Sequence, residues 1–313
     1  MQKLAADHGC NHRGSPELLG GGVELSRVFR SFAVSWVLLA GLLILAPAHD
    51  SQAASKKRPS HRHRASSPQI IPQKPRSGVQ AGEAESLYYA GVALHAKGNY
   101  AEAVEKFKAA LQKRTEFPEA RHAMGLSLAA QGALDEAIHE YRAALSVQPE
   151  FAAIHNNLGV ALSEKGKVDE AIEAYRYAIR LQPGNAAPHH NLALALEAKD
   201  DVDGAVEEYR ETLRLQPDNA TAHNNLGLVL QRKGQLDEAI GEYRAALRLQ
   251  AGPAAALYSL NLSAALLAKG ELDGAVGSGR TAVRLQPQNA DAHYNLGLAL
   301  KAKGEFDGGL AAF

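Results

Sequence analysis

Cysteine is nearly absent from this 313-residue chain, and its scarcity excludes two classes of protein. The single Cys10 cannot form an internal disulfide, and no C-x-x-C pair occurs, so neither a disulfide-stapled domain nor a cysteine metal site is expected. His8 and His12 flank Cys10, but two-residue spacings outside regular secondary structure fix no ligand geometry. We therefore predict that the chain holds no metal and no other cofactor.

The sequence motifs of common enzymes are also missing. No glycine-rich phosphate loop, H-E-x-x-H or G-x-S-x-G occurs, and His139-Glu140 lacks a second histidine. The many carboxylates fall on the expected starts of helices and on solvent faces, so periodicity identifies no acid–base pair in a pocket. We predict that the chain is not an enzyme and has no catalytic residues.

Aromatic residues make up only 6% of the chain, although 46% of its residues are hydrophobic and many are alanine. Such a composition favours close helix–helix contact over a bulky core. The net charge is zero, but it is unevenly distributed: residues 49–83 hold seven Lys and Arg against two acidic residues, whereas residues 84–313 hold 23 against 29. A basic segment thus precedes a mildly acidic body, and we predict no nucleic-acid partner.

The N-terminal 48 residues have the layout of an export segment. Arg27 and Arg30 precede an apolar run over residues 32–46, which ends in the small-residue pattern Ala46-Pro47-Ala48. About 15 apolar residues fall short of the roughly 20 that a spanning helix needs. We predict a signal peptide cleaved after Ala48, with a second candidate site at Ala53, and a periplasmic or secreted protein.

The alternative is an uncleaved anchor formed by residues 32–46. Basic residues follow the apolar run, and they would keep that side in the cytoplasm if the segment stayed uncleaved. Residues 49–83 are rich in Pro, Ser, Lys and Arg and show no hydrophobic period, so we predict a disordered linker. Its role is that of a solvated spacer or, alternatively, of a membrane contact made through residues 27–64.

From residue 84 onward the chain repeats itself every 34 residues. We number the frames as repeats 1 to 7: 84–117, 118–151, 152–185, 186–219, 220–253, 256–289 and a shortened 290–313. Position 8 of the frame is small: Gly91, Gly125, Gly159, Ala193, Gly227, Ser263 and Gly297. Position 24 is aromatic in six repeats: Phe107, Tyr141, Tyr175, Tyr209, Tyr243 and Phe313.

Other positions of the frame predict two helices per repeat. Leucines at positions 7 and 11 form an apolar stripe with helical spacing. Position 15 is usually glycine, which ends the first helix in a left-handed conformation, and Asp-Glu-Ala then opens the second. Ala254 and Ala255 form an insertion before repeat 6. Within that repeat Gly277 and Gly279 form a glycine pair, and Gly279 replaces the aromatic residue, so we expect a loosened hairpin there.

The period and these positions resemble the tetratricopeptide repeat family. The resemblance covers about 230 residues and implies an all-α fold, a right-handed α-solenoid of helix-turn-helix repeats. Because each hairpin exposes an apolar flank that only the next hairpin can cover, the repeats should stack. The family also implies a concave face, lined by the first helices, that binds extended segments of partner proteins.

Position 6 is the candidate binding position on that face. It holds a carboxamide in five consecutive repeats: Asn157, Asn191, Asn225, Asn261 and Asn295. An amide both donates and accepts, so such a row can pair with a peptide backbone, and it resembles the asparagine ladder of O-linked N-acetylglucosamine transferases. Neighbouring candidates occupy position 5: Asn156, His190, Asn224 and Tyr294. The alternative is that the amides bond locally within the protein.

Histidines recur at position 4, as His155, His189, His223 and His293. Neighbouring helices lie about 8–10 Å apart, so at most adjacent pairs could meet, and we expect packed histidines instead of metal ligands. Arg232 and Lys301 are the cations expected near the inner face.

Three functions remain open at this stage. The first is an exported scaffold that binds an extended protein segment. The second is the substrate-binding half of a larger enzyme of the glycosyltransferase type, since the last repeat stops within its expected second helix. The third is an assembly platform in a cell envelope.

Overall fold

The computed structural model describes residues 82–305, which belong to one compact unit of the chain. The predicted export segment, the predicted linker up to residue 81, and residues 306–313 lie outside the described residues. Among the described helices, none is long and apolar enough to cross a membrane.

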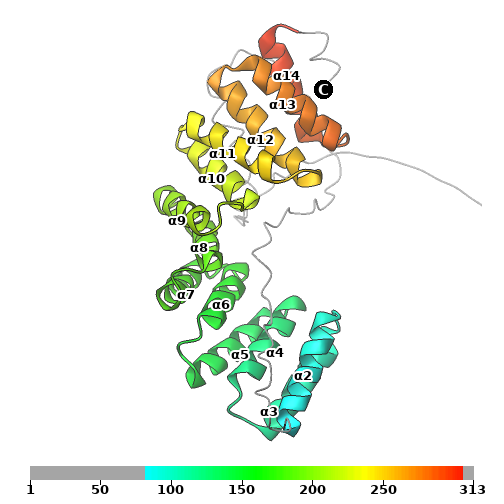
Figure 1. The fold of residues 1–313 in the computed structure, drawn as a ribbon, viewed down its shortest axis with the longest axis vertical. Helices are drawn as coiled ribbons and strands as arrows, with labels where there is room; N and C mark the ends of the chain where they lie inside the picture. Colours follow the sequence, from blue (N-terminus) through cyan, green and yellow to red (C-terminus); the bar gives the residue numbers. More distant parts are fainter. Residues whose placement is uncertain (1–81, 306–313) are drawn as a thin grey trace, which may run out of the picture. The chain divides into compact units, whose positions relative to one another are not determined.

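The described residues form thirteen α-helices and no strand (Figure 1). The first helices of the repeats are α2 (Glu83–Ala96), α4 (Pro118–Ala130), α6 (Ala152–Glu164), α8 (Ala186–Ala198), α10 (Ala220–Arg232), α12 (Pro253–Lys269) and α14 (Ala290–Lys303). The second helices are α3 (Tyr100–Lys113), α5 (Leu134–Val147), α7 (Val168–Leu181), α9 (Val202–Leu215), α11 (Leu236–Leu249) and α13 (Leu272–Leu285). The predicted all-α class is confirmed.

The turn inside each hairpin depends on the residue at position 15. Gly166 and Gly234 have φ of 78° and 75°, the left-handed region in which a Cβ is costly. Repeat 4 carries Asp200 there instead, at φ 65°, and Asp200 is the one described non-glycine residue with positive φ. At the start of the next hairpin, Asn219 and Asn289 accept hydrogen bonds from backbone N–H groups of the first turn.

Every helix contacts the next helix in sequence, so the hairpins stack as an α-helical solenoid. First helices of neighbouring hairpins also contact one another in most of the described stack, whereas second helices show no comparable contact there. The first helices therefore lie on the more crowded side. The two inserted residues before repeat 6 are absorbed by α12, which has 17 residues where most first helices have 13.

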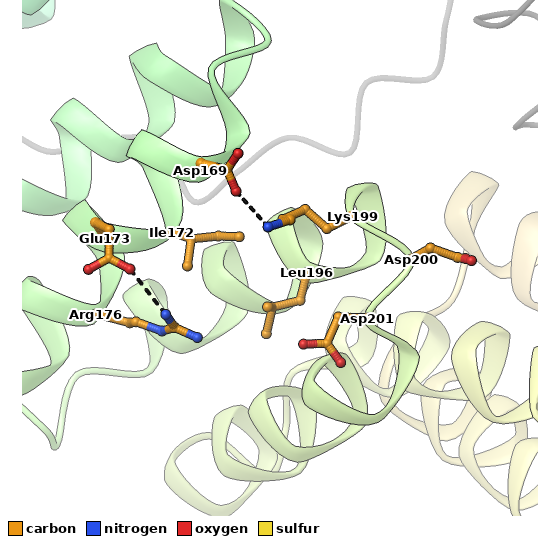
Figure 2. Close-up of a pocket in the computed structure, with 8 residues that line it drawn as sticks. All are labelled: Asp169, Ile172, Glu173, Arg176, Leu196, Lys199, Asp200 and Asp201. Carbon is orange, nitrogen blue, oxygen red and sulfur yellow. Dashed lines mark hydrogen bonds and ion pairs between the residues drawn. The ribbon is translucent and has the colours of Figure 1, made fainter.

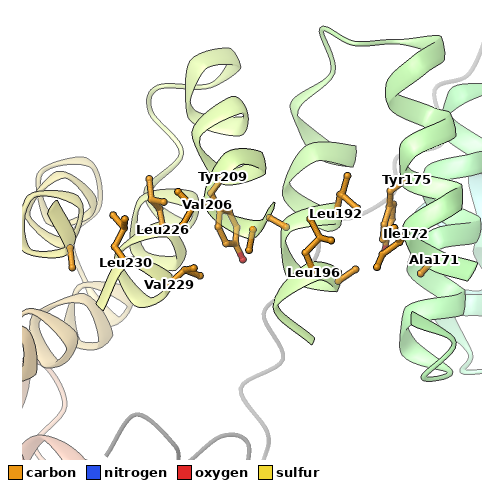
Figure 3. Close-up of a cluster of buried hydrophobic side chains, with 14 of the residues drawn as sticks. Ala171, Ile172, Tyr175, Leu192, Leu196, Val206, Tyr209, Leu226, Val229 and Leu230 are labelled. Carbon is orange, nitrogen blue, oxygen red and sulfur yellow. The ribbon is translucent and has the colours of Figure 1, made fainter. Parts of the chain in front are cut away.

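The core forms around the small residue at position 8. A Cβ on Gly159 would lie 2.5 Å from Cε1 of Tyr175, so the ring of α7 rests directly on the backbone of α6. Tyr175, Tyr209 and Tyr243 are at most 2% exposed. Figure 3 shows part of this core, in which leucines of α8 and α10 lie beside tyrosines of α7 and α9. The glycine–aromatic pairing therefore sets the close approach within the hairpins of repeats 1, 2, 3 and 5.

Repeat 6 differs from the expectation of a loosened hairpin. A Cβ on Gly279 would lie 3.3 Å from Cα of Leu296, so α14 occupies the space that the aromatic ring fills elsewhere. Ser263, at position 8, donates a 2.7 Å hydrogen bond to the carbonyl of Ala275 and ties α12 to α13. The missing ring is thus replaced by closer helix packing, and the expectation was wrong because the next hairpin closes the gap.

Candidate interaction surface on the first helices

The asparagines of position 6 lie on first helices, as the periodicity predicted, but their exposure is uneven. Asn157, Asn191 and Asn225 are only 6%, 2% and 2% exposed. Asn261 and Asn295 are partly exposed. The position-5 residues follow the same division: Asn156, His190 and Asn224 are buried, whereas Tyr294 is 45% exposed.

Several of these carboxamides bond across the boundary between repeats. Asn191 donates from Nδ2 to Oδ1 of Asn156 at 3.0 Å, and Asn261 donates to Oδ1 of Asn224 at 2.8 Å. The partner in each case is position 5 of the preceding repeat. We call this set the amide relay: His122, Asn156, Asn157, Asn191, Asn224, Asn225 and Asn261. Sequence reasoning missed the relay, although the recurrence of a polar residue 35 positions earlier was a signal for it.

His122 takes the position-5 place in repeat 2 and begins the relay. Its Nε2 lies 2.8 Å from Nδ2 of Asn157, so the ring accepts the amide hydrogen and is neutral there. Burial lowers the pKa of His122 from 6.5 to about 4. Protonation would remove the acceptor and place a charge in the inter-repeat contact.

The relay bears directly on the predicted peptide contacts. The amide groups of Asn157 and Asn191 donate to side chains of the preceding repeat. This is the local bonding that the sequence left open as the alternative to peptide binding. Oδ1 of Asn191 and Nδ2 of Asn225 are buried without a hydrogen-bond partner. Contact between a peptide and these carboxamides therefore stays a prediction, and it would require the helices to part around Asn191 and Asn225.

The histidines of position 4 serve their own hairpins. Nδ1 of His189 lies 2.6 Å from Oε2 of Glu208, and His223 is paired with Glu242 at the same distance. The other ring nitrogen faces the carbonyl of the proline that closes the preceding repeat, as in His155 with Pro149 at 2.8 Å. No cluster of metal-ligating residues exists within residues 82–305.

The position-4 pair follows a spacing of 19 residues that sequence reasoning overlooked. Repeat 2 makes the same contact with different chemistry, since Arg121 donates to Glu140 at 3.0 Å. The pair joins the first and second helices of one hairpin. It therefore holds the two helices of the hairpin together, and His189 and His223 make it in repeats 4 and 5.

The two cations predicted near the inner face, Arg232 and Lys301, differ in whether they form ion pairs. Arg232 donates to Asp200 at 2.5 Å and lies 4.0 Å from Glu197. Burial raises the pKa of Glu197, whereas the hydrogen bond from Tyr209 and the charge of Arg232 lower it. Lys301, in contrast, is exposed and makes no ion pair with any described residue.

A shallow hollow of about 480 Å³ opens between α7, the end of α8 and the start of α9 (Figure 2). At the preceding boundary Arg142 donates to Glu170 at 2.7 Å, whereas repeat 4 carries Gly204 at the position of that glutamate, so Arg176 has no equivalent partner there. The lining residues of the hollow are Asp169, Ile172, Glu173, Arg176, Leu196, Lys199, Asp200 and Asp201.

The charges around this hollow are already paired. Lys199 donates to Asp169 at 2.6 Å, and Arg176 donates to Glu173 at 3.1 Å. Asp201 accepts from the backbone N–H of Gly204 and so caps α9. The hollow is therefore lined by surface groups that already bond to one another.

These features define a class of protein before any comparison is made: an all-helical repeat array that offers a long surface of first helices. The profile described as "Tetratricopeptide repeat" matches residues 122–186 and 190–256, and the profile described as "TPR repeat" matches residues 91–132 and 264–304. The chain belongs to the tetratricopeptide repeat family, as the 34-residue period predicted.

Solved structures show the same fold. Pseudomonas aeruginosa pilF is 21% identical, with a TM-score of 0.59, over 67% of this chain and 94% of that one. YrrB, described as a TPR protein with an unusual peptide-binding site, is 22% identical, with a TM-score of 0.54, over 64% and 99%. A tetratricopeptide repeat protein of Parabacteroides merdae is 18% identical, with a TM-score of 0.57, over 74% and 91%. The comparison with curated proteins gives no match.

Proposed function

We propose that this chain is a scaffold that binds an extended protein segment along the face of its first helices. The observation that carries the proposal is a row of partly exposed aliphatic side chains at position 9, one turn beyond the relay residues. The row consists of Val160, Leu194, Leu228, Ala264 and Leu298. Apolar side chains beside amides suit a peptide, which brings both apolar side chains and backbone groups to pair.

Further support comes from the polar groups of the hairpins, most of which bond to other groups of the array. The histidines and most ion pairs join neighbouring helices, so these groups serve the stack itself. The charges of the first-helix face are few, and Arg232 is neutralised by Asp200. A surface with so little free charge favours recognition of a protein segment through shape and backbone contacts.

Site-specific photo-crosslinking in the native host tests this function. A photoreactive amino acid placed at Leu194 and at Leu228 should capture the same partner protein. The matched control is Glu207, which is exposed on the second helix α9 and should capture nothing specific. Capture of unrelated proteins at Leu194 and Leu228, or equal capture from Glu207, would contradict a binding face on the first helices.

We also propose that the scaffold acts outside the cytoplasm. The support is the sequence alone: Arg27 and Arg30, the apolar run over 32–46, and the small residues that end it. N-terminal sequencing of the protein from its native host should find His49 as the first residue. An intact start before residue 32 would instead support an anchored or a cytoplasmic protein.

A further inference from the structure

No bond of the amide relay crosses the boundary between repeats 6 and 7 within the described residues. Position 5 of repeat 6 is Leu260, so the acceptor that Asn156 and Asn224 supply to Asn191 and Asn261 is missing for Asn295. Asn295 has no side-chain hydrogen bond within residues 82–305 and is partly exposed. Its donor and acceptor are therefore accessible to a ligand, whereas the unpartnered atoms of Asn191 and Asn225 are buried.

Exposed apolar side chains gather around the same boundary. Four large apolar residues of the described chain are at least 40% exposed, and two of them, Leu257 and Tyr294, lie on first helices. Leu257 is on α12 and Tyr294 is on α14, and these two helices are in contact. Leu260 and Leu298 are partly exposed on the same faces. We call this set the α12–α14 surface: Leu257, Leu260, Tyr294, Asn295, Leu298 and Lys301.

The equivalent positions of repeats 3 to 5 lack this character. Leu257 stands at position 2, where those repeats carry Ala153, Ala187 and Thr221. Their position-5 residues are buried and polar, whereas Tyr294 is 45% exposed. The large apolar side chains of first helices that are at least 40% exposed thus lie only on α12 and α14 within the described chain, on the same helix pair as Asn295.

Helix α14 of the α12–α14 surface carries a positive charge near one end and a negative charge near the other. Lys301 follows Leu298 by three residues, so both side chains lie on one face of α14. Asp291 lies at the other end of that helix, ten residues before Lys301. A segment that places a carboxylate beside Lys301 and apolar side chains toward Leu257 would complement both the charge and the apolar area.

We propose that the α12–α14 surface anchors an extended apolar protein segment that carries one carboxylate. Its apolar side chains pack against Leu257, Leu260 and Tyr294. Its backbone pairs with the carboxamide of Asn295, and its carboxylate lies beside Lys301. This inference rests on the proposed function, because it assigns the partner chemistry and the location to the same face of first helices.

Selection and binding measurements with the full chain test the inference. Ten-residue peptides selected from a random display library should contain spaced apolar residues and one acidic group. Binding of a selected peptide, followed by fluorescence anisotropy, should weaken about tenfold in Lys301→Glu and severalfold in Leu257→Ser and in Asn295→Ala. Changing the acidic residue of the peptide to lysine should restore binding to Lys301→Glu.

The control keeps the two proposals apart. Arg284→Glu makes the same charge change on the second helix α13, where Arg284 is exposed without an ion pair in the described chain, and it should leave binding unchanged. Binding lost in Leu194→Arg and Leu228→Arg but kept in all α12–α14 variants would overturn this inference and leave the scaffold function standing.

Two other outcomes would refute both proposals: peptide binding that no first-helix variant weakens, or a selection that yields no peptide. A dimer by light scattering that Leu257→Ser abolishes would assign the surface to a second copy of the chain.

Discussion

At the scale of single residues, the carboxamides of position 6 have two different environments. Asn191 is buried and bonded to Asn156 across a repeat boundary, whereas Asn295 is partly exposed, and the position equivalent to Asn156 holds Leu260. The same residue type at the same repeat position thus serves the stack in one place and faces solvent in another. The difference depends on a residue 35 positions earlier in the chain.

Alanine substitutions at these two positions should therefore have unequal effects on stability. Asn191→Ala leaves Oδ1 of Asn156 buried without that donor, which should cost about 1–3 kcal/mol of unfolding free energy. Asn295→Ala removes no such bond and should change stability by less than about 0.5 kcal/mol. Urea unfolding followed by circular dichroism measures both, and an equal loss in the two variants would contradict the assigned relay.

His122 makes the stability of the array depend on pH. Its pKa is about 4 in the folded protein and near 6.5 when unfolded, so the unfolded chain binds more protons between these values. Stability should fall as the pH drops from about 6.5 to 4, by roughly 3 kcal/mol from this residue.

His122→Asn provides the comparison, since Asn156 and Asn224 occupy the same position in other repeats. The variant should unfold with a flatter pH dependence than the wild type over this range, whatever its stability at pH 7. Urea midpoints measured at intervals from pH 7 to pH 4 give the two curves. Parallel curves would show that His122 is not the group that titrates.

The residue scale also marks the limit of what the sequence can predict. Periodicity placed Asn157 and Asn191 on the first helices correctly, because position within a 34-residue frame fixes the helix and its face. It could not decide whether their amides meet a partner protein or a neighbouring repeat. That choice depends on contacts such as Asn191 with Asn156, and those distances follow from how the hairpins stack.

At the scale of helices, the 34-residue repeat frame predicted where helices end and begin more completely than it predicted side-chain contacts. The glycine of position 15 ends the first helix in the left-handed region, and Asp-Glu-Ala opens the second, as expected. The local prediction for repeat 6 failed, because Gly279 suggested a lost contact when it instead admits Leu296. A missing side chain leaves a gap only if the neighbouring helix cannot move in, and the sequence does not contain that information.

Helix α13 carries three glycines, Gly274, Gly277 and Gly279, within 14 residues, and should be the least stable of the second helices. A Cβ on Gly277 meets nothing within 4 Å, so Gly277→Ala should raise stability by about 0.5–1 kcal/mol. It should also slow hydrogen exchange of the α13 amides.

Gly279→Ala is the matched variant in the same helix. Its new methyl group would press on Ser263 and on the backbone of Leu296, so the variant should lose stability despite the better helix propensity of alanine. Exchange measured by mass spectrometry on both variants separates propensity from packing. A stabilised Gly279→Ala would mean that α13 and α14 are not closely packed.

At the scale of the whole array, a column of ion pairs joins successive repeats. Lysine at position 14 reaches aspartate at position 18 of the preceding repeat, at five boundaries in a row. The pairs are Lys165–Asp135, Lys199–Asp169, Lys233–Asp203, Lys269–Asp237 and Lys303–Asp273. Each pair is exposed and contributes about 0–1 kcal/mol, so only the column as a whole should be measurable.

The contribution of the whole ion-pair column to stability should be measurable from its dependence on salt concentration. Raising NaCl from 0.01 M to 0.5 M screens exposed pairs and should lower the Tm of the wild type. Lys199→Glu should lower the Tm slightly at low salt, and Asp169→Lys in the same chain should recover most of the loss. Scanning calorimetry of the three proteins at both salt concentrations tests the column, and a double variant no better than Lys199→Glu would refute the pairing.

The regular spacing of these contacts has a consequence for how the array can change its length. Lys233 stands to Asp203 as Lys199 stands to Asp169, and each of the five ion pairs reaches only the adjacent hairpin. Removing residues 186–219 would bring Lys233 to Asp169 and Asn225 to Asn156, so a shortened array would keep its internal bonds. Repeat 6 is not interchangeable in this way, because Leu260 and Gly279 suit only the hairpin that follows. Duplication or loss of single repeats can therefore lengthen or shorten the middle of the array. Repeats 6 and 7, in contrast, would have to be duplicated or lost together.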